Sequence, residues 1–143
     1  MMSKLIRLSA LVLLLGGFAL DADTAESAPP EWAALAGVEE IQVLSENPDG
    51  AKRETTVWLA VLDGEGYIRT GDTSWYPNLE RKPEIAVRID GREYAVTAQL
   101  VSEQTLIDRV VAVFAEKYGW SDTIRGWVIR SAPHIVKLVP RTA

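Results

Sequence analysis

Much of the chain between residues 39 and 100 shows the hydrophobic and polar pattern of β-strands. Residues 39–45 alternate between apolar and polar positions, which is the period of a half-buried strand. Residues 55–62 are β-branched, aromatic and almost uniformly apolar, which is typical of a central strand. Between them, residues 47–50 read Asn-Pro-Asp-Gly, a strong turn signal. The pattern therefore predicts two strands joined by a turn.

Two further hairpins follow from Asp-Gly and Gly-rich turns. Residues 63–66 read Asp-Gly-Glu-Gly, and they turn the strand 55–62 into a short strand at 67–70. Asp90 and Gly91 join residues 84–89 to residues 92–100. This pair is the clearest hairpin signal in the chain, because a type I′ turn needs positive φ at both central positions. Residues 134–139 alternate again and are expected to form the last strand.

Beyond residue 100 the hydrophobic period becomes that of a helix. Apolar side chains recur three or four positions apart over residues 103–117 and form one face: Leu106, Ile107, Val110, Val113 and Phe114. We predict a helix here that Ser102 caps and that ends near Gly119. Val110 and Phe114 are expected to be buried against the sheet.

Shorter helical segments are expected elsewhere. Residues 76–82 predict a short helix with Thr73 or Ser74 as its N-cap, stopped by Pro83. Residues 32–36 predict a single helical turn, and residues 121–130 fit either a short helix or a loop. Consecutive hairpins with one long covering helix predict a mainly β, α+β fold, an antiparallel barrel or strongly curled sheet of about six strands.

The N-terminus has the layout of a signal peptide. Lys4 and Arg7 form a basic region, and the 13 residues 8–20 are apolar apart from Ser9, within the usual range of roughly 7–15 and short of the ~20 that span a bilayer. Cleavage is expected after Ala19 or Ala22, and an uncleaved membrane anchor is the alternative. We expect residues 1–22 to be this segment, 23–31 a linker and 32–143 an exported domain, periplasmic or extracellular. Membrane contact is then expected only through an uncleaved N-terminal segment.

Composition excludes several classes of function. The formal net charge of −5 argues against a nucleic-acid partner, since nonspecific binding to phosphates needs a basic face. The chain has no cysteine and one histidine, His134, so neither a thiolate site nor a multi-histidine metal centre can form. No metal site is expected.

The strands and the segment between them resemble the pyridoxamine-phosphate-oxidase-like split β-barrels, most closely the deazaflavin-dependent nitroreductases and quinone reductases. The resemblance covers residues 41–141 and is carried by the Thr pair at 55–56, Gly-Tyr-Ile at 66–68, Trp-Tyr-Pro-Asn-Leu at 75–79, Lys-Pro-Glu at 82–84 and residues 91–96. It implies a six-stranded antiparallel split barrel with one long covering helix and short helices, and a homodimer. The implied cofactor is FMN or 8-hydroxy-5-deazaflavin, and the implied activity is that of an oxidoreductase.

A flavin-type site needs cations for phosphate, a flat surface for the ring and free N–H groups. The candidate cofactor-binding residues are Lys52, Arg53, Thr55, Arg69, Ser74, Trp75, Tyr76 and Asn78. Lys52, Arg53 and Arg69 are the candidate cations, the helix N-terminus near Ser74 offers N–H groups, and Trp75 with Trp58 can wall the ring. In the alternative interpretation these aromatic side chains fill the core or close one barrel end, and Asn78 bonds to nearby backbone.

The chain departs from the family at the loop before the central strand. A basic, serine-rich loop is usual there, with an arginine directly before the Thr pair. Here the loop comprises residues 46–53 and is a partly acidic turn, and Glu54 separates Arg53 from Thr55. A second hypothesis therefore stays open: a non-catalytic exported binding module whose pocket takes a planar or lipid-like ligand.

Overall fold

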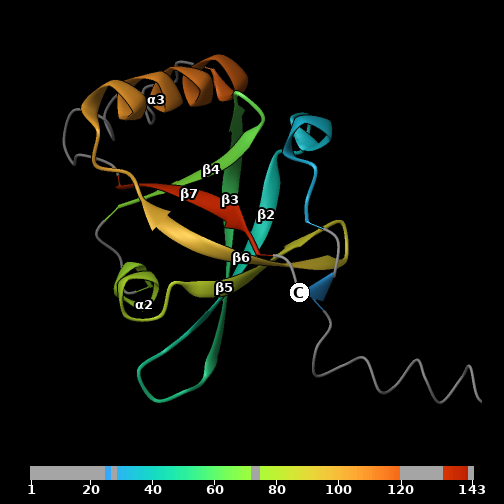
Figure 1. Cartoon of the computed structure of the whole chain (residues 1–143), viewed down its shortest axis with the longest axis vertical. Coiled ribbons are helices and arrows are strands. Elements are labelled where there is room, and N and C mark those ends of the chain that lie inside the picture. The colour runs from blue at the N-terminus through green and yellow to red at the C-terminus, as the bar shows by residue number, and fades with distance from the viewer. Residues whose placement is uncertain (1–24, 27–28, 72–74, 120–133, 142–143) are drawn as a thin grey trace, which may run out of the picture.

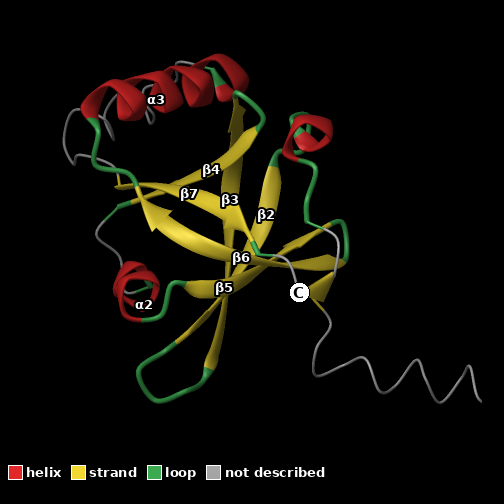
Figure 2. Ribbon diagram, in the orientation of Figure 1, coloured by secondary structure: helices red, strands yellow, loops and turns green. Residues whose placement is uncertain are grey.

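The computed structural model describes residues 25–26, 29–71, 75–119 and 134–141. Within this part of the chain, short helices and one long helix accompany a single seven-stranded sheet (Figures 1 and 2). The elements are β1 (Ala25–Glu26), η1 (Trp32–Leu35), β2 (Glu40–Glu46), β3 (Lys52–Leu62), β4 (Glu65–Thr70), α2 (Tyr76–Arg81), β5 (Glu84–Ile89), β6 (Arg92–Leu100), α3 (Gln104–Tyr118) and β7 (His134–Pro140).

The six longer strands close into an antiparallel barrel. The sheet order is β1-β6-β5-β2-β3-β4-β7, and β6 pairs with β7 as well, which joins the two sides of the sheet. The strand β3 changes partner along its length: Lys52 to Trp58 pair with β2, and Leu59 to Leu62 pair with β4 on the other edge. The barrel wall is therefore split beside the first half of β3.

Two hydrophobic clusters hold the barrel together. The larger one fills its interior with alternate residues of the strands, for example Ile41, Val43, Leu59 and Ile68, all fully buried. The second cluster lies between α3 and the sheet and includes Val110 and Phe114, both 0% exposed, which confirms their predicted burial. Figure 2 shows α3 lying across one end of the strands β3 and β4.

The segment before β2 packs against the barrel interior. Trp32 of η1 is buried, and its indole Nε1 donates a hydrogen bond to the carbonyl oxygen of Leu138 at 3.2 Å. Its ring lies directly over Gly66 of β4, where an added Cβ would come within 2.6 Å of the ring. A glycine is required at this strand position because the indole occupies the space of a side chain.

Several boundaries differ from the predictions. The expected N-caps Thr73 or Ser74 and Ser102 are wrong, since α2 begins after Trp75 and α3 after Glu103, neither with a capping side-chain bond. Pro77 lies in the first turn of α2, where its missing N–H costs nothing.

The remaining predictions concern one hairpin, the linker and the segment 121–130. The hairpin at Asp90 and Gly91 is confirmed, with φ of 50° and 82° at the two residues. The proposed linker contains the two-residue strand β1, which pairs in parallel with β6, because a sheet edge offers backbone partners to any sequence. The segment 121–130 lies outside the described residues.

Candidate functional site

A pocket of about 340 Å³ opens where the barrel wall is split. Its walls come from the first half of β3, the end of β4, the residue before α2 and the start of β2. They are formed by Glu40, Thr55, Thr56, Val57, Trp58, Arg69, Thr70, Gly71 and Trp75. We call this the Arg69 pocket. It is of the size that small cofactors occupy, near the lower end of the roughly 300–1,000 Å³ range.

Arg69 is the basic side chain among these lining residues. Its guanidinium carbon lies 5.1 Å from the ring centroid of Trp58 and 5.1 Å from that of Phe114, so that the cation lies against two aromatic rings. Burial lowers the pKa of Arg69 from its ordinary value. The side chain nevertheless stays charged at neutral pH, because the ordinary pKa of arginine is so high. A partly buried, charged guanidinium in a pocket favours an anionic ligand.

The wall formed by Trp58 is held in place from α3. The Trp58 and Tyr118 rings stack with centroids 4.2 Å apart and planes 5° from parallel, and Phe114 stacks on Tyr118 at 6.0 Å. The Tyr118 hydroxyl lies 2.6 Å from the carbonyl oxygen of Glu39 and 2.7 Å from that of Leu59, and it accepts the Leu59 N–H at 3.2 Å. Burial is the main cause that raises the pKa of Tyr118 to about 12. The stack therefore fixes one wall of the pocket.

Lys117 adds a second tie between α3 and the strands. Its Nζ donates to the carbonyl oxygen of Leu59 at 2.9 Å and to that of Val38. The ammonium also lies 5.2 Å from the ring centroid of Tyr118. Burial lowers the pKa of Lys117. The C-terminal turn of α3 is thus hydrogen-bonded both to β3 and to the segment before β2, next to the position of Trp58 in β3.

The hydroxyl of Thr55 is the most informative polar group of the pocket. It is buried, yet within the described part of the chain Thr55 Oγ1 has no hydrogen-bond partner. Burying a hydroxyl without a partner costs about 1–3 kcal/mol. Such groups are rare in native structures, and each calls for a physical reason. A ligand in the Arg69 pocket that offers a hydrogen-bonding atom to Thr55 would supply one.

The structure brings together only part of the predicted site. Thr55, Arg69 and Trp75 line the pocket. Trp58, which was expected either to wall the ring or to fill the core, lines it too. The candidate cations Lys52 and Arg53 are not among the lining residues; Lys52 is exposed, and Arg53 pairs with Ser45 further along the β2–β3 ladder. Ser74 lies outside the described residues.

Tyr76 and Asn78 are engaged in contacts within the protein. The Tyr76 ring stacks on His134 with centroids 3.9 Å apart and an angle of 10° between their planes. Asn78 is 1% exposed; its Nδ2 donates to Asn47 Oδ1 at 2.9 Å, and its Oδ1 accepts from Arg81 at 3.0 Å. These contacts tie α2 to the turn between β2 and β3 and to β7. The partners of the Asn78 side chain are other side chains, whereas the alternative interpretation named nearby backbone groups.

Sequence reasoning missed some residues of the site. Glu40, Thr70 and Gly71 line the pocket because strand ends converge there, and Tyr118 supports Trp58 from the last residue of α3. The helical spacing predicted Phe114 on the buried face, and extending that spacing by four positions would have found Tyr118. Among the described residues, no group of three or more metal-binding side chains occurs.

The split wall, the covering helix and the closed strand order define the fold of the pyridoxamine-phosphate-oxidase-like split barrels, as the sequence resemblance predicted. The chain belongs to the family DUF2255, described as an uncharacterized protein conserved in bacteria, whose model matches residues 31–136. Among curated proteins, no sequence matches the chain significantly.

Over the part of the chain that the structure describes, no helix is long and apolar enough to cross a membrane.

Solved structures share the fold. The conserved hypothetical protein Rv2991 from Mycobacterium tuberculosis has a TM-score of 0.62 at 22% identity, over 76% of this chain and 78% of its own. HutZ from Vibrio cholerae, described as a heme storage protein, has a TM-score of 0.63 at 16% identity, over 73% of this chain and 83% of its own. A candidate pyridoxamine 5′-phosphate oxidase from Listeria innocua has a TM-score of 0.57 at 17% identity, over 77% and 90%. At these identities the likeness establishes the fold.

Proposed function

We propose that this chain is a flavin- or deazaflavin-binding split barrel that holds its cofactor in the Arg69 pocket and acts as an oxidoreductase of the nitroreductase or quinone reductase type. Three groups in the pocket support this function. The Trp58 ring offers a flat wall, Arg69 offers a charged donor beside it, and Thr55 offers a buried hydroxyl. A planar ring with an anionic substituent matches all three.

The buried hydroxyl of Thr55 carries the proposal. Two hydroxyl oxygens of the described residues are buried without a partner, Ser45 Oγ and Thr55 Oγ1, and of these two Thr55 Oγ1 is the one that belongs to a lining residue of the Arg69 pocket. Among the described residues it has no partner, so a bound ligand recovers the free energy that burial costs. Arg69 would hold the anionic group of the ligand, and Trp58 and Trp75 would exclude water from the ring. The redox chemistry itself is what the cofactor supplies when bound.

The alternative is a non-catalytic binding module on the same fold. Lys52 and Arg53, the cations that a phosphate cradle would use, are not among the residues that line the pocket. Glu40 places a carboxylate at its wall instead. One guanidinium and one carboxylate suit a planar ligand with a single anionic group better than a cofactor with several phosphates or a polyglutamate tail. Heme is also planar, and one of its two carboxylates would bind Arg69.

Export and self-association are further parts of the proposal. The basic region and the apolar run at the N-terminus support an exported domain, which a reporter active only outside the cytoplasm, fused to Ala143, would test. An intact but inactive fusion would contradict export. The fold resemblance supports a homodimer, and the mass measured in solution by light scattering tests it.

Ligand titration tests the site. The purified protein should be examined for a bound chromophore by its absorbance spectrum, and then titrated calorimetrically with FMN, a deazaflavin and heme. We expect Arg69→Ala to weaken binding by more than tenfold, because a hydrogen bond to a charged group contributes about 1.5–3 kcal/mol. Thr55→Val should weaken binding without lowering the stability of the free protein, since it removes a hydroxyl that lacks a partner.

The control variant is Arg92→Ala, at an exposed arginine that begins β6. It changes the net charge by the same amount and should leave the affinity unchanged. Equal losses in Arg69→Ala and Arg92→Ala would contradict the site. If the bound cofactor, first chemically reduced, is oxidised by an added quinone that becomes the quinol, the oxidoreductase is supported. Binding of FMN or deazaflavin without this reaction supports the binding module. If none of the three ligands binds the parent protein, the proposed function is wrong.

A further inference from the structure

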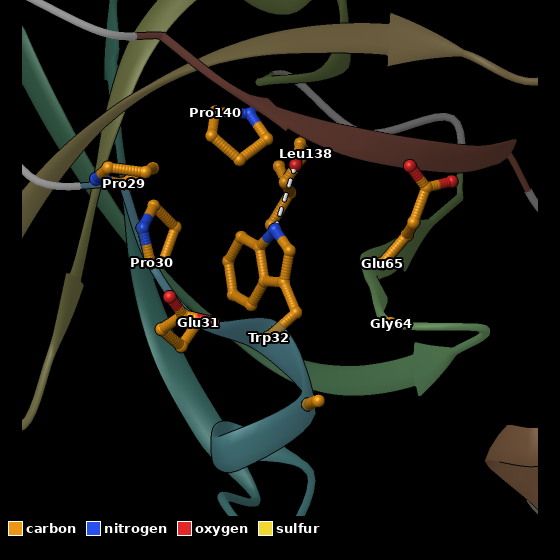
Figure 3. Close-up of a pocket in the computed structure, with 9 residues that line it drawn as sticks. Pro29, Pro30, Glu31, Trp32, Gly64, Glu65, Leu138 and Pro140 are labelled. Atoms are coloured by element: carbon orange, nitrogen blue, oxygen red, sulfur yellow. Dashed lines mark hydrogen bonds between the residues drawn. The ribbon is translucent and has the colours of Figure 1, made fainter.

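A second pocket, of about 330 Å³, is lined by Gly64 and Glu65 at the start of β4, whereas the Arg69 pocket lies at the end of that strand. Figure 3 shows this second pocket. We call it the Trp32 pocket. The Trp32 indole stands within it, with its ring nitrogen directed toward Leu138, and three prolines and Ala33 add apolar surface. Figure 3 shows Pro29 and Pro30 on one side of the indole and Glu65 on the other. This pocket shares no lining residue with the Arg69 pocket.

The walls of the Trp32 pocket are fixed by contacts within the protein. Trp32 is 3% exposed, its Nε1 is bonded to Leu138, and its ring rests on Gly66. The lining prolines have restricted backbone torsions, so little freedom is lost there when a ligand binds. The pocket is therefore preformed for a compact apolar body.

Both charged residues that line the Trp32 pocket are acidic. Glu31 and Glu65 are the charged residues among those that line it. Lys137 pairs with Glu65 at 2.5 Å but is not itself a lining residue. The hydrogen bond to Glu65 is the main cause that raises the pKa of Lys137. Lys137 therefore offsets part of the charge of Glu65, but the lining of the pocket, which has two carboxylates and no cation, still favours a cation on an apolar body.

We propose that the Trp32 pocket binds a small organic cation, an amine carried on a compact aromatic or aliphatic body. The apolar body would lie against Pro29, Ala33 and Pro140, over the small exposed part of the Trp32 ring, and the ammonium would lie beside the carboxylates that line the pocket. An anion is disfavoured there by both carboxylates. The site is independent of the proposed function, because a different ligand class and different residues are involved.

The test compares three probes of nearly the same shape: phenethylammonium, 2-phenylethanol and phenylacetate. Calorimetric titration of the full chain should rank their affinities in that order, with phenylacetate the weakest. Glu31→Gln and Glu65→Gln should each weaken phenethylammonium about two- to fivefold, the usual range for an exposed charge pair, and leave 2-phenylethanol unchanged. Glu116→Gln, at an exposed carboxylate on α3, is the matched control and should change none of the affinities.

A second variant blocks the pocket without touching its core. Ala33 is exposed and lines the pocket, so Ala33→Lys introduces a cation there and should abolish phenethylammonium binding while the protein stays folded. Equal affinities for phenethylammonium and 2-phenylethanol would overturn the proposal. So would an unchanged affinity in both Gln variants, or the absence of phenethylammonium binding to the parent protein at millimolar concentration.

Discussion

The Arg69 pocket and the Trp32 pocket lie at the two ends of one short strand, and they differ in charge. Glu65, the first residue of β4, lines one, and Arg69 and Thr70, its last residues, line the other. Five residue steps along a strand span about 17 Å. The volumes, about 330 and 340 Å³, are nearly equal. Size therefore does not distinguish the two pockets, and the chemistry of their lining does.

The elements that pack behind the two pockets differ as well. The Arg69 pocket is backed by side chains of α3, which place a stack of aromatic rings behind Trp58. The Trp32 pocket is backed by the backbone of β4 at Gly66 and by one hydrogen bond to β7. The Arg69 pocket is thus shaped by a helix and the Trp32 pocket by a short 3₁₀ segment that packs on a glycine. Separate substitutions should disturb each end alone.

The largest effect is expected at the helix-backed end. Phe114 is fully buried and contacts both Tyr118 and the Arg69 guanidinium. Phe114→Ala should lower the free energy of unfolding by about 3–5 kcal/mol, as measured by urea denaturation. Any ligand of the Arg69 pocket should also bind more weakly to the folded protein. Thr105→Ala, at an exposed position of the same helix, should change the stability little. An unchanged urea midpoint in Phe114→Ala would contradict this placement of α3.

A smaller effect is expected at the glycine-backed end. In Gly66→Ala the new Cβ would lie 2.6 Å from the Trp32 ring, so the indole must shift. Overpacking of this kind costs about 1–3 kcal/mol. Gly37→Ala is the matched control, because no heavy atom lies within 4 Å of its Cβ position. Its stability should change by less than about 0.5 kcal/mol. Equal denaturation curves for the two variants would show that Trp32 does not rest on β4.

The sequence predicted more of the fold than of the pockets. Alternation and Asp-Gly turns gave the strands and hairpins, since both signals act between near neighbours in the chain. The split in the wall depends on where β3 exchanges β2 for β4, at Trp58 and Leu59. No local pattern encodes that register. The convergence of Glu40, Thr55 and Arg69 on one pocket is a consequence of that register, as is the distance of Lys52 from it.

The Trp32 pocket likewise depends on a contact that the local sequence pattern does not predict. Residues 32–36 were predicted as one helical turn, and the structure has a 3₁₀ turn over Trp32–Leu35. The pattern of these residues gives the turn but not its packing partner. Gly66 was read as part of a hairpin turn, whereas its role is to accept the indole from a segment more than thirty residues earlier. Only tertiary contact reveals that role.

The smallest effect is expected from alkaline pH, and it should act on the Arg69 end. Burial is the main cause that raises the pKa of Tyr118 from 10.0 to about 12, and the nearby Glu39 and Glu40 carboxylates act in the same direction. A group whose pKa is raised on folding contributes stability below its unfolded pKa. That contribution is lost as the pH rises through the folded value. The stability should therefore fall between pH 10 and about 12. The effect is modest because the side chain is only partly buried.

Urea denaturation at several pH values tests this, with Tyr118→Phe as the comparison. Tyr118→Phe should be less stable at pH 8, because it loses the hydrogen bonds to Glu39 and Leu59, but its stability should fall less steeply above pH 10. Some slope should remain, since burial also raises the pKa of Tyr67. Lys117 has the opposite effect on the stability. Because folding lowers its pKa, the folded protein loses this proton first, and the stability rises with pH up to the unfolded pKa of 10.5. Identical slopes in parent and variant would mean that the phenolate of Tyr118 is tolerated behind Trp58. The wall of the Arg69 pocket would then be less tightly closed than the rings of α3 imply.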